Sequence, residues 1–301
     1  MILNLILYGI LFISTVQQHS LPPVLPAYFE GDASHETIIL SAKLDEISGM
    51  AFSEDGRLFA HDDERGEIFN LDQKTGKILK RFYIGSKKGR KEDFEGLAIV
   101  GKYFYMVTSE GNIFQFLEGD DEENVDYIEI KTGLAEDLNV EGLCFDPVTK
   151  TLLLACKDSE KKGIDQPRSV FGFSLENLTL IKTPRFVLSP AEIYDDQEES
   201  LSEKIGRFFL LIDEPGVTPS GLERHPVTGS FFILSSRGPL LIELSPDGEV
   251  IAKVKLDATR HNQPEGLVFT PDNYMIISDE AGDEHARLTI YRPDVKRFPS
   301  R

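Results

Sequence analysis

Short apolar runs recur along this chain, and each run follows polar residues in a repeated order. The repeated phrase is a polar residue, any residue, Glu or Ser, Gly, and then Leu or Met, and its clearest copy is Asp93-Phe94-Glu95-Gly96-Leu97. The glycines of the five copies lie 47, 46, 79 and 45 residues apart, at Gly49, Gly96, Gly142, Gly221 and Gly266. A period near 45 residues is typical of repeated four-stranded sheets. The pattern predicts an all-β protein, a β-propeller of five four-stranded blades.

Within each repeat, apolar runs separated by turn residues predict the strands of one blade. In the first repeat they are residues 49–53, 58–60, 67–71 and 78–84. The last repeat offers only three, residues 267–269, 274–277 and 288–291. A β-rich run near the N-terminus, residues 37–44, can supply the missing strand. Closure by this N-terminal strand would leave no open sheet edge, which favours a closed propeller.

The interval of 79 residues leaves two questions open. The fourth strand of the third blade is either residues 184–188 or residues 208–212, and the acidic residues 190–204 could form a short helix. Two shortened blades within this interval would give six blades in all.

The N-terminal segment predicts export or membrane attachment. Residues 2–16 are almost continuously apolar, a length that fits a signal-peptide core or a short membrane anchor. We therefore expect a signal peptide or anchor over residues 1–20, a linker over residues 21–36 and the propeller over residues 37–301. Whether the segment is cleaved or retained stays open. The expected location is the cell membrane, the periplasm or the extracellular space.

Charge and motifs exclude several classes of function. The formal net charge is −19, from 51 acidic and 32 basic residues, and such a surface repels nucleic acid. It favours cations as partners. The sequence contains no P-loop, dinucleotide fingerprint, nucleophile elbow or Cys/His metal spacing. We expect a monomer that binds an unknown small molecule or an envelope protein.

The two cysteines, Cys144 and Cys156, are close in sequence but are expected to stay reduced. With the hairpin turn at residues 147–150, Cys144 should face Leu153 and Cys156 should face Glu141. A disulfide needs adjacent Cβ atoms, so the register predicts two free thiols.

The candidate chemistry lies on one face of the predicted propeller. The residues before the five glycines should surround the channel mouth, and the loops between second and third strands should open on the same face. Oxygen ligands of this kind suit Ca²⁺ or Mg²⁺. The predicted metal ligands are Glu95, Glu141, Glu265, Asp62 and Asp279. Further residues expected on this face are Ser48, Ser220, His261, Arg237 and Lys157. His261 is either a general base beside Glu265 or a surface-loop histidine without a role.

Several phrases of the sequence resemble one known family. DFEGLA, NVEGLCFDPVTKTLLLACKD, PSGLERHPVTGSFFILSSRGPLLIELSPDGEV and QPEGLVF, with MIISDEA after the last, are similar to the SdiA-regulated (YjiK-like) propeller family. The resemblance covers about residues 37–293. It implies a β-propeller held outside the cytoplasm, often behind an N-terminal membrane segment, with calcium bound at the channel. It implies no particular reaction.

Two functions from different classes follow from these observations. The first is a calcium-binding propeller that binds a ligand or partner without catalysis. The second is a metal-dependent hydrolase of the phytase, esterase or lactonase type, in which the same carboxylates hold the metal. The first is favoured, because no acid/base pair stands out in the sequence.

Overall fold

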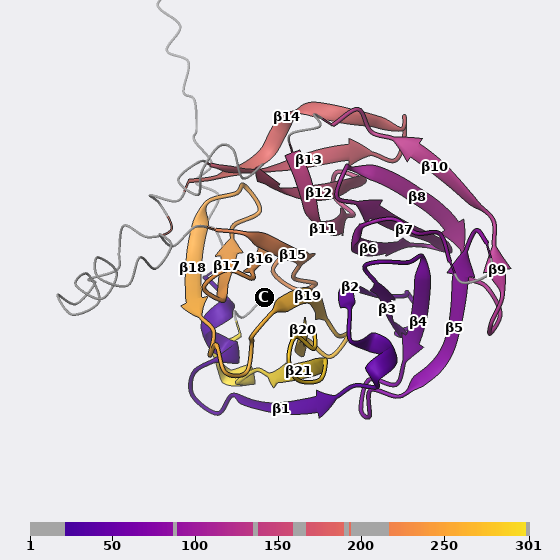
Figure 1. The fold of residues 1–301 in the computed structure, drawn as a ribbon. Helices are drawn as coiled ribbons and strands as arrows, with labels where there is room; N and C mark the ends of the chain where they lie inside the picture. The colour runs from indigo at the N-terminus through magenta and orange to yellow at the C-terminus, as the bar shows by residue number, and fades with distance from the viewer. Residues whose placement is uncertain are drawn as a thin grey trace, which may run out of the picture.

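Five antiparallel sheets stand around a central axis in the computed structural model, as Figure 1 shows. The structure describes residues 22–86, 89–134, 138–158, 167–189, 193 and 217–298. Each sheet begins with a strand beside the axis and ends with a strand at the rim. The fold is a five-bladed β-propeller, as the glycine period predicts.

In blades one to four the strands follow one another in the chain from the axis outward. Blade one contains β2 (Ile47–Phe52), β3 (Leu58–Asp62), β4 (Glu67–Leu71) and β5 (Ile78–Ile84). Blade two contains β6 (Phe94–Val100), β7 (Tyr103–Thr108), β8 (Asn112–Leu117) and β10 (Tyr127–Lys131). Blade three contains β11 (Leu138–Asp146), β12 (Thr151–Asp158), β13 (Arg168–Ser174) and β14 (Thr179–Leu188). Blade four contains β15 (Pro219–Arg224), β16 (Phe231–Ser235), β17 (Leu240–Leu244) and β18 (Val250–Lys255). The short β9 (Asn124–Val125) pairs in parallel with β5.

An N-terminal strand closes the ring. Blade five contains β19 (Pro264–Phe269), β20 (Met275–Asp279) and β21 (Arg287–Arg292), and its outer strand is β1 (Ser34–Ile39), antiparallel to β21. The predicted closure is confirmed, although the strand starts and ends earlier than residues 37–44. The end of that run forms the 3-10 helix η2 (Ala42–Leu44), which buries Leu44.

The outer strand of blade three is the first of the two alternatives. β14 contains residues 184–188 and extends back to Thr179. The other alternative, residues 208–212, and the expected helix over residues 190–204 lie outside the described residues, apart from Ile193.

Part of the segment expected to be a linker is packed onto the propeller. Residues 1–21 lie outside the described residues, but η1 (Leu25–Tyr28) and Val24 belong to the core between blades four and five. The backbone N–H groups of Val24 and Leu25 donate to the two carboxylate oxygens of Glu243, at 3.1 and 2.7 Å. Residues 24–28 are therefore part of the folded domain and not a free spacer. No helix among the described residues is long and apolar enough to cross a membrane.

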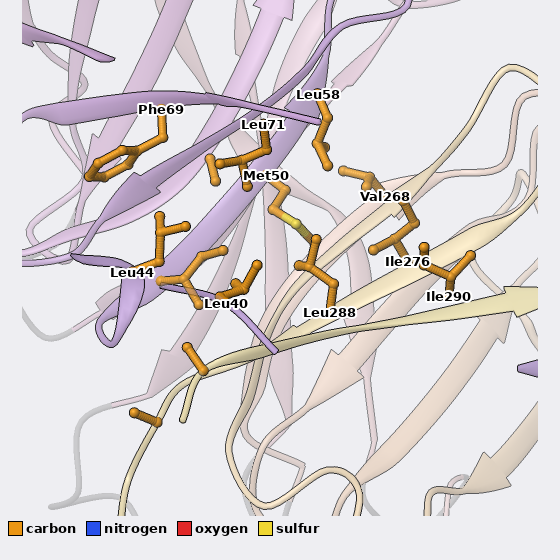
Figure 2. Packing of buried hydrophobic residues seen from close by; sticks show 14 residues of the cluster. Leu40, Leu44, Met50, Leu58, Phe69, Leu71, Val268, Ile276, Leu288 and Ile290 are labelled. Atoms are coloured by element: carbon orange, nitrogen blue, oxygen red, sulfur yellow. The ribbon is translucent and has the colours of Figure 1, made fainter. Parts of the chain in front are cut away.

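The core is divided into five clusters, one between each pair of neighbouring blades. Figure 2 shows the cluster between blades one and five, where Met50 and Leu58 face Val268 and Leu288. The blades therefore adhere through their faces, which leaves the edges of the innermost strands to surround the axis.

Both cysteines are buried thiols that form no disulfide with each other, as predicted. Cys144 lies opposite Leu153, which confirms its predicted register. Cys156 lies opposite Val140 and not Glu141, because the pairing skips one residue at Glu141. The same irregularity shapes the candidate site.

A candidate site at the axis of the propeller

Every repeated phrase carries a β-bulge at its Glu or Ser. In β6, Phe94 pairs with Thr108 and Gly96 pairs with the next residue, Val107, so Glu95 has no pairing partner. The same skip occurs around Glu141, Ser220 and Glu265, and β2 skips both Ser48 and Gly49. A bulge re-aims the side chain of the extra residue. Five repeats thus form a ring of re-aimed Ser and Glu residues at one end of the axis.

The glycine that follows each bulge allows the innermost strands to approach one another. A Cβ added at Gly96 would lie 2.7 Å from the Cβ of Leu143 and 2.8 Å from its backbone nitrogen. A Cβ added at Gly266 would lie 2.6 Å from the carbonyl oxygen of Ser48. These distances are shorter than van der Waals contact, so the phrase needs glycine for close packing at the axis.

The ring surrounds a very small cavity. Its volume is about 10 Å³, and its polar lining side chains are Glu95, Ser220 and Glu265. A space of this size holds a single water-sized occupant. The channel is therefore not an open pore at this end, and any occupant of this space would lie beside carboxyl groups.

Burial dominates the electrostatics of the ring. Burial, with smaller contributions from the neighbouring Glu141 and Asp93, raises the pKa of Glu95 to about 9. Burial also raises the pKa of Glu265 well above its usual value and raises that of Glu141. Lys157 opposes these shifts, since its Nζ lies 2.5 Å from Glu141 Oε1. One ammonium faces three carboxyl groups, so the ring takes up protons or attracts a further cation.

The two serines of the ring connect neighbouring blades. Ser220 Oγ donates to the carbonyl oxygen of Pro264 at 2.6 Å, and the carbonyl oxygen of Ser48 accepts from Ser278 Oγ at 3.3 Å. Blade four is thus bonded to blade five, and blade five to blade one. His61 holds the bulge of β2 in place, because its Nε2 accepts from the backbone N–H of Gly49 at 3.0 Å.

Asp279, predicted as a metal ligand, and His261, predicted as a general base or a surface-loop residue, both lie in the core. Both side chains are fully buried, and His261 Nδ1 lies 2.9 Å from Asp279 Oδ2. The other ring nitrogen, Nε2, lies 2.6 Å from the hydroxyl of Tyr291. The expectation of a surface-loop histidine is wrong, because the loop before β19 folds inward. With both nitrogens occupied, His261 holds Asp279 and Tyr291 together.

A second acidic group lies where blades one and five meet. Single carboxylate oxygens of Glu46, Asp63 and Glu280 lie within 4.8 Å of one another, and no other such group of three occurs among the described residues. Burial raises the pKa of Asp63 to about 6 and that of Glu280 to about 8. Here carboxyl groups come to metal-ligand separation, which the three glutamates of the ring do not reach.

The sequence prediction selects the same loops as this second group, but at adjacent positions. It selected Asp62 and Asp279, and the clustered residues are the next ones, Asp63 and Glu280. Asp62 is half-buried beside them, with a pKa raised to about 6 by burial and by Asp63. Side chains alternate between the two faces of a strand, so an error of one residue places the predicted side chain on the opposite face.

Arg237 is exposed in the turn between β16 and β17, and the structure does not bring it into either acidic group.

No protein-family model matches the sequence, and no curated protein sequence matches it. Solved structures match its fold. Glutaminyl cyclase from Myxococcus xanthus aligns over 86% of this chain and 95% of its own, with a TM-score of 0.55 and 15% identity. The PQQ-bound aldose sugar dehydrogenase from Streptomyces coelicolor aligns over 90% and 100%, with a TM-score of 0.52 and 14% identity. A luciferin-regenerating enzyme aligns over 87% and 96%, with a TM-score of 0.53 and 9% identity. At these identities the likeness establishes a β-propeller fold and nothing about the reaction.

Proposed function

We propose that this protein is a binding propeller of the cell envelope whose acidic face binds Ca²⁺ and, with it, a ligand or partner. The observation that carries the proposal is the ring of three glutamates, of which Glu95 and Glu265 line a space for one water-sized occupant. Lys157 is the only basic side chain that the described residues place against this ring. A bound cation would supply the missing positive charge and lower the pKa values of the carboxyl groups.

The carboxylates at the junction of blades one and five extend this acidic face. Glu46, Asp63 and Glu280 offer the hard oxygen ligands that Ca²⁺ prefers, at separations that one ion can bridge. The ring and this group provide two alternative positions for the cation. Substitutions in one group or the other distinguish the two positions.

The proposal can be tested by thermal unfolding in a chelator and during Ca²⁺ titration. A ligand that binds only the folded state stabilises it, by about 2.7 kcal/mol at a concentration near 100 times Kd. Wild-type protein should gain stability with Ca²⁺. Glu95→Gln combined with Glu141→Gln should abolish the gain if the ring is the site, and Asp63→Asn combined with Glu280→Gln should abolish it if the junction is.

Glu110→Gln provides the matched control, since Glu110 is exposed in the turn between β7 and β8. This variant should respond to Ca²⁺ as wild type does. If neither Ca²⁺ nor Mg²⁺ stabilises the wild-type protein, the cation-binding function is refuted.

A hydrolase is the second candidate, and one observation favours it. Glu95, with its pKa raised to about 9, is protonated at neutral pH and lies against the Glu141–Lys157 pair. Neighbouring carboxyl groups in different environments are typical of acid/base chemistry. Assays with phosphomonoesters, carboxylic esters and lactones test this candidate. Turnover that is lost in Glu95→Gln would favour it over the binding function.

A further inference from the structure

The opposite end of the channel contains a second, much larger cavity. Its volume is about 490 Å³, and the ends of all five innermost strands, β2, β6, β11, β15 and β19, contribute to its wall. Pockets for small molecules are commonly about 300–1,000 Å³. Leu97 and Leu143 line both this cavity and the small one, so they lie between the two ends.

The wall follows the repeat, one layer for each position after the glycine. The residues two positions after the glycines form the inner layer, and they are Ala51, Ala98, Cys144, Glu223 and Val268. The residues three positions after the glycines form the outer layer, and they are Phe52, Ile99, Phe145, Arg224 and Phe269. Four repeats supply small apolar residues and large apolar residues in these layers. Blade four alone supplies a carboxylate and a guanidinium.

The nearby guanidinium of Arg224 favours the charged form of Glu223, but the two side chains do not form an ion pair. Glu223 Oε1 accepts from the backbone N–H of Arg224 at 2.8 Å and lies 3.8 Å from Cys144 Sγ. The guanidinium of Arg224 pairs instead with Asp146, with Nε 3.4 Å from Oδ1. In the part of the chain that the structure describes, no basic side chain forms an ion pair with Glu223. A carboxylate in an apolar wall is costly unless a positive charge compensates it.

We propose that this cavity binds an organic cation, an amine whose aromatic or aliphatic body lies against the apolar wall and whose ammonium group pairs with Glu223. Phe52, Phe145 and Phe269 line the cavity and provide apolar surface for the body of the amine. This site is separate from the acidic ring, requires no metal and involves no reaction.

Direct binding of 2-phenylethylamine tests the proposal, by calorimetry or ligand-observed NMR on the full chain. Wild type should bind the amine at least about tenfold more tightly than 2-phenylethanol or 3-phenylpropionate, because a charge-assisted bond is lost with either analogue. Glu223→Gln should weaken amine binding by a similar factor and leave 2-phenylethanol unaffected. Phe145→Leu should weaken binding of both compounds.

Glu110→Gln is the control for non-specific attraction to the acidic surface, and it should bind the amine as wild type does. The pH dependence provides a further readout. Burial raises the pKa of Glu223 to about 7, and the charged and titratable groups around it are Cys144 and Asp146 on β11, Arg224 on β15 and Glu54 at the rim. Amine binding should therefore strengthen from pH 6 to pH 8 in wild type and stay constant in Glu223→Gln.

Failure of wild type to bind the amine at millimolar concentration would overturn the proposal. So would equal affinity for the amine and the alcohol, or unchanged amine binding by Glu223→Gln.

Discussion

The two ends of the central channel are built from the same five strands and differ in chemistry. At one end, bulged residues form a ring of three glutamates and two serines. Glu95, Ser220 and Glu265 of this ring line a space for one water-sized occupant. At the other end, regularly paired residues form a mainly apolar wall around a cavity of about 490 Å³, in which the repeat positions contribute one carboxylate, that of Glu223. The difference lies in the backbone: the bulge turns side chains out of the sheet at the first end, and the pleat keeps them in the blade interfaces at the second.

The two ends of the channel also place charge near the axis in different ways. At the bulged end the repeat itself supplies carboxyl groups, and Lys157 partly compensates them. At the apolar end a single departure from the repeat, Glu223, supplies one.

The largest effect is expected from Gly96→Ala, which breaks the packing of the bulged end. The added Cβ would lie within 2.8 Å of Leu143 backbone, which cannot move without displacing blade three. We expect a loss of about 3 kcal/mol in the free energy of unfolding, measured by urea denaturation. Gly221→Ala, whose Cβ would approach no atom closer than 3.1 Å, should cost clearly less. Equal costs would show that glycine is not needed for close approach.

Much of this architecture could be predicted from the sequence. The glycine period gave the blade number, and the shortage of one strand in the last repeat predicted closure by β1. The bulges could not be predicted, because a skip in pairing depends on the neighbouring strand. That is why Cys156 was placed opposite Glu141, and why Asp279 was expected at the metal site and not in the core with His261. Glu223 was missed although its signal was present: it is the only charged residue two positions after a repeat glycine.

Lys157→Met removes the compensating charge and should have the second largest effect. Without the ammonium group, the carboxylates of Glu141 and its neighbours have no cation to pair with when they ionise. We expect a loss of about 2 kcal/mol at pH 8, less than for a fully buried ion pair since Lys157 is partly exposed. At pH 5 the loss should shrink, because the raised pKa values of these glutamates favour their protonation as the pH falls. Lys131→Met, at an exposed position in β10, should cost little at either pH. A loss that is equal at both pH values would mean that Lys157 acts through packing alone.

Glu95→Gln measures how much the buried charge of Glu95 lowers the stability of the protein as the pH rises. The folded-state pKa, about 9, lies above the unfolded value near 4.5, so the folded state holds the extra proton between these pH values. Stability is therefore complete below pH 4.5 and falls as pH rises toward 9. In a chelator, Glu95→Gln should remove roughly 1–2 kcal/mol of this decline, after allowance for solvent screening. Parallel stability-against-pH curves for wild type and variant would contradict the assignment, and added Ca²⁺ should flatten the wild-type curve.

The smallest effect is expected from Glu223→Leu at the apolar end, and this variant should stabilise the protein. The folded-state pKa of Glu223 is about 7, so its contribution to stability is complete below the unfolded pKa near 4.5 and is lost between pH 4.5 and pH 7. Leucine has similar size and no charge to bury, and it matches the apolar residues of the other four repeats. The variant should be more stable than wild type by about 1 kcal/mol at pH 8 and nearly equal to it at pH 5. Thermal unfolding at both pH values measures the difference. Destabilisation at pH 8 would mean that the Glu223 carboxylate is already compensated within the protein, and the contrast between the two ends of the channel would then lie in shape alone.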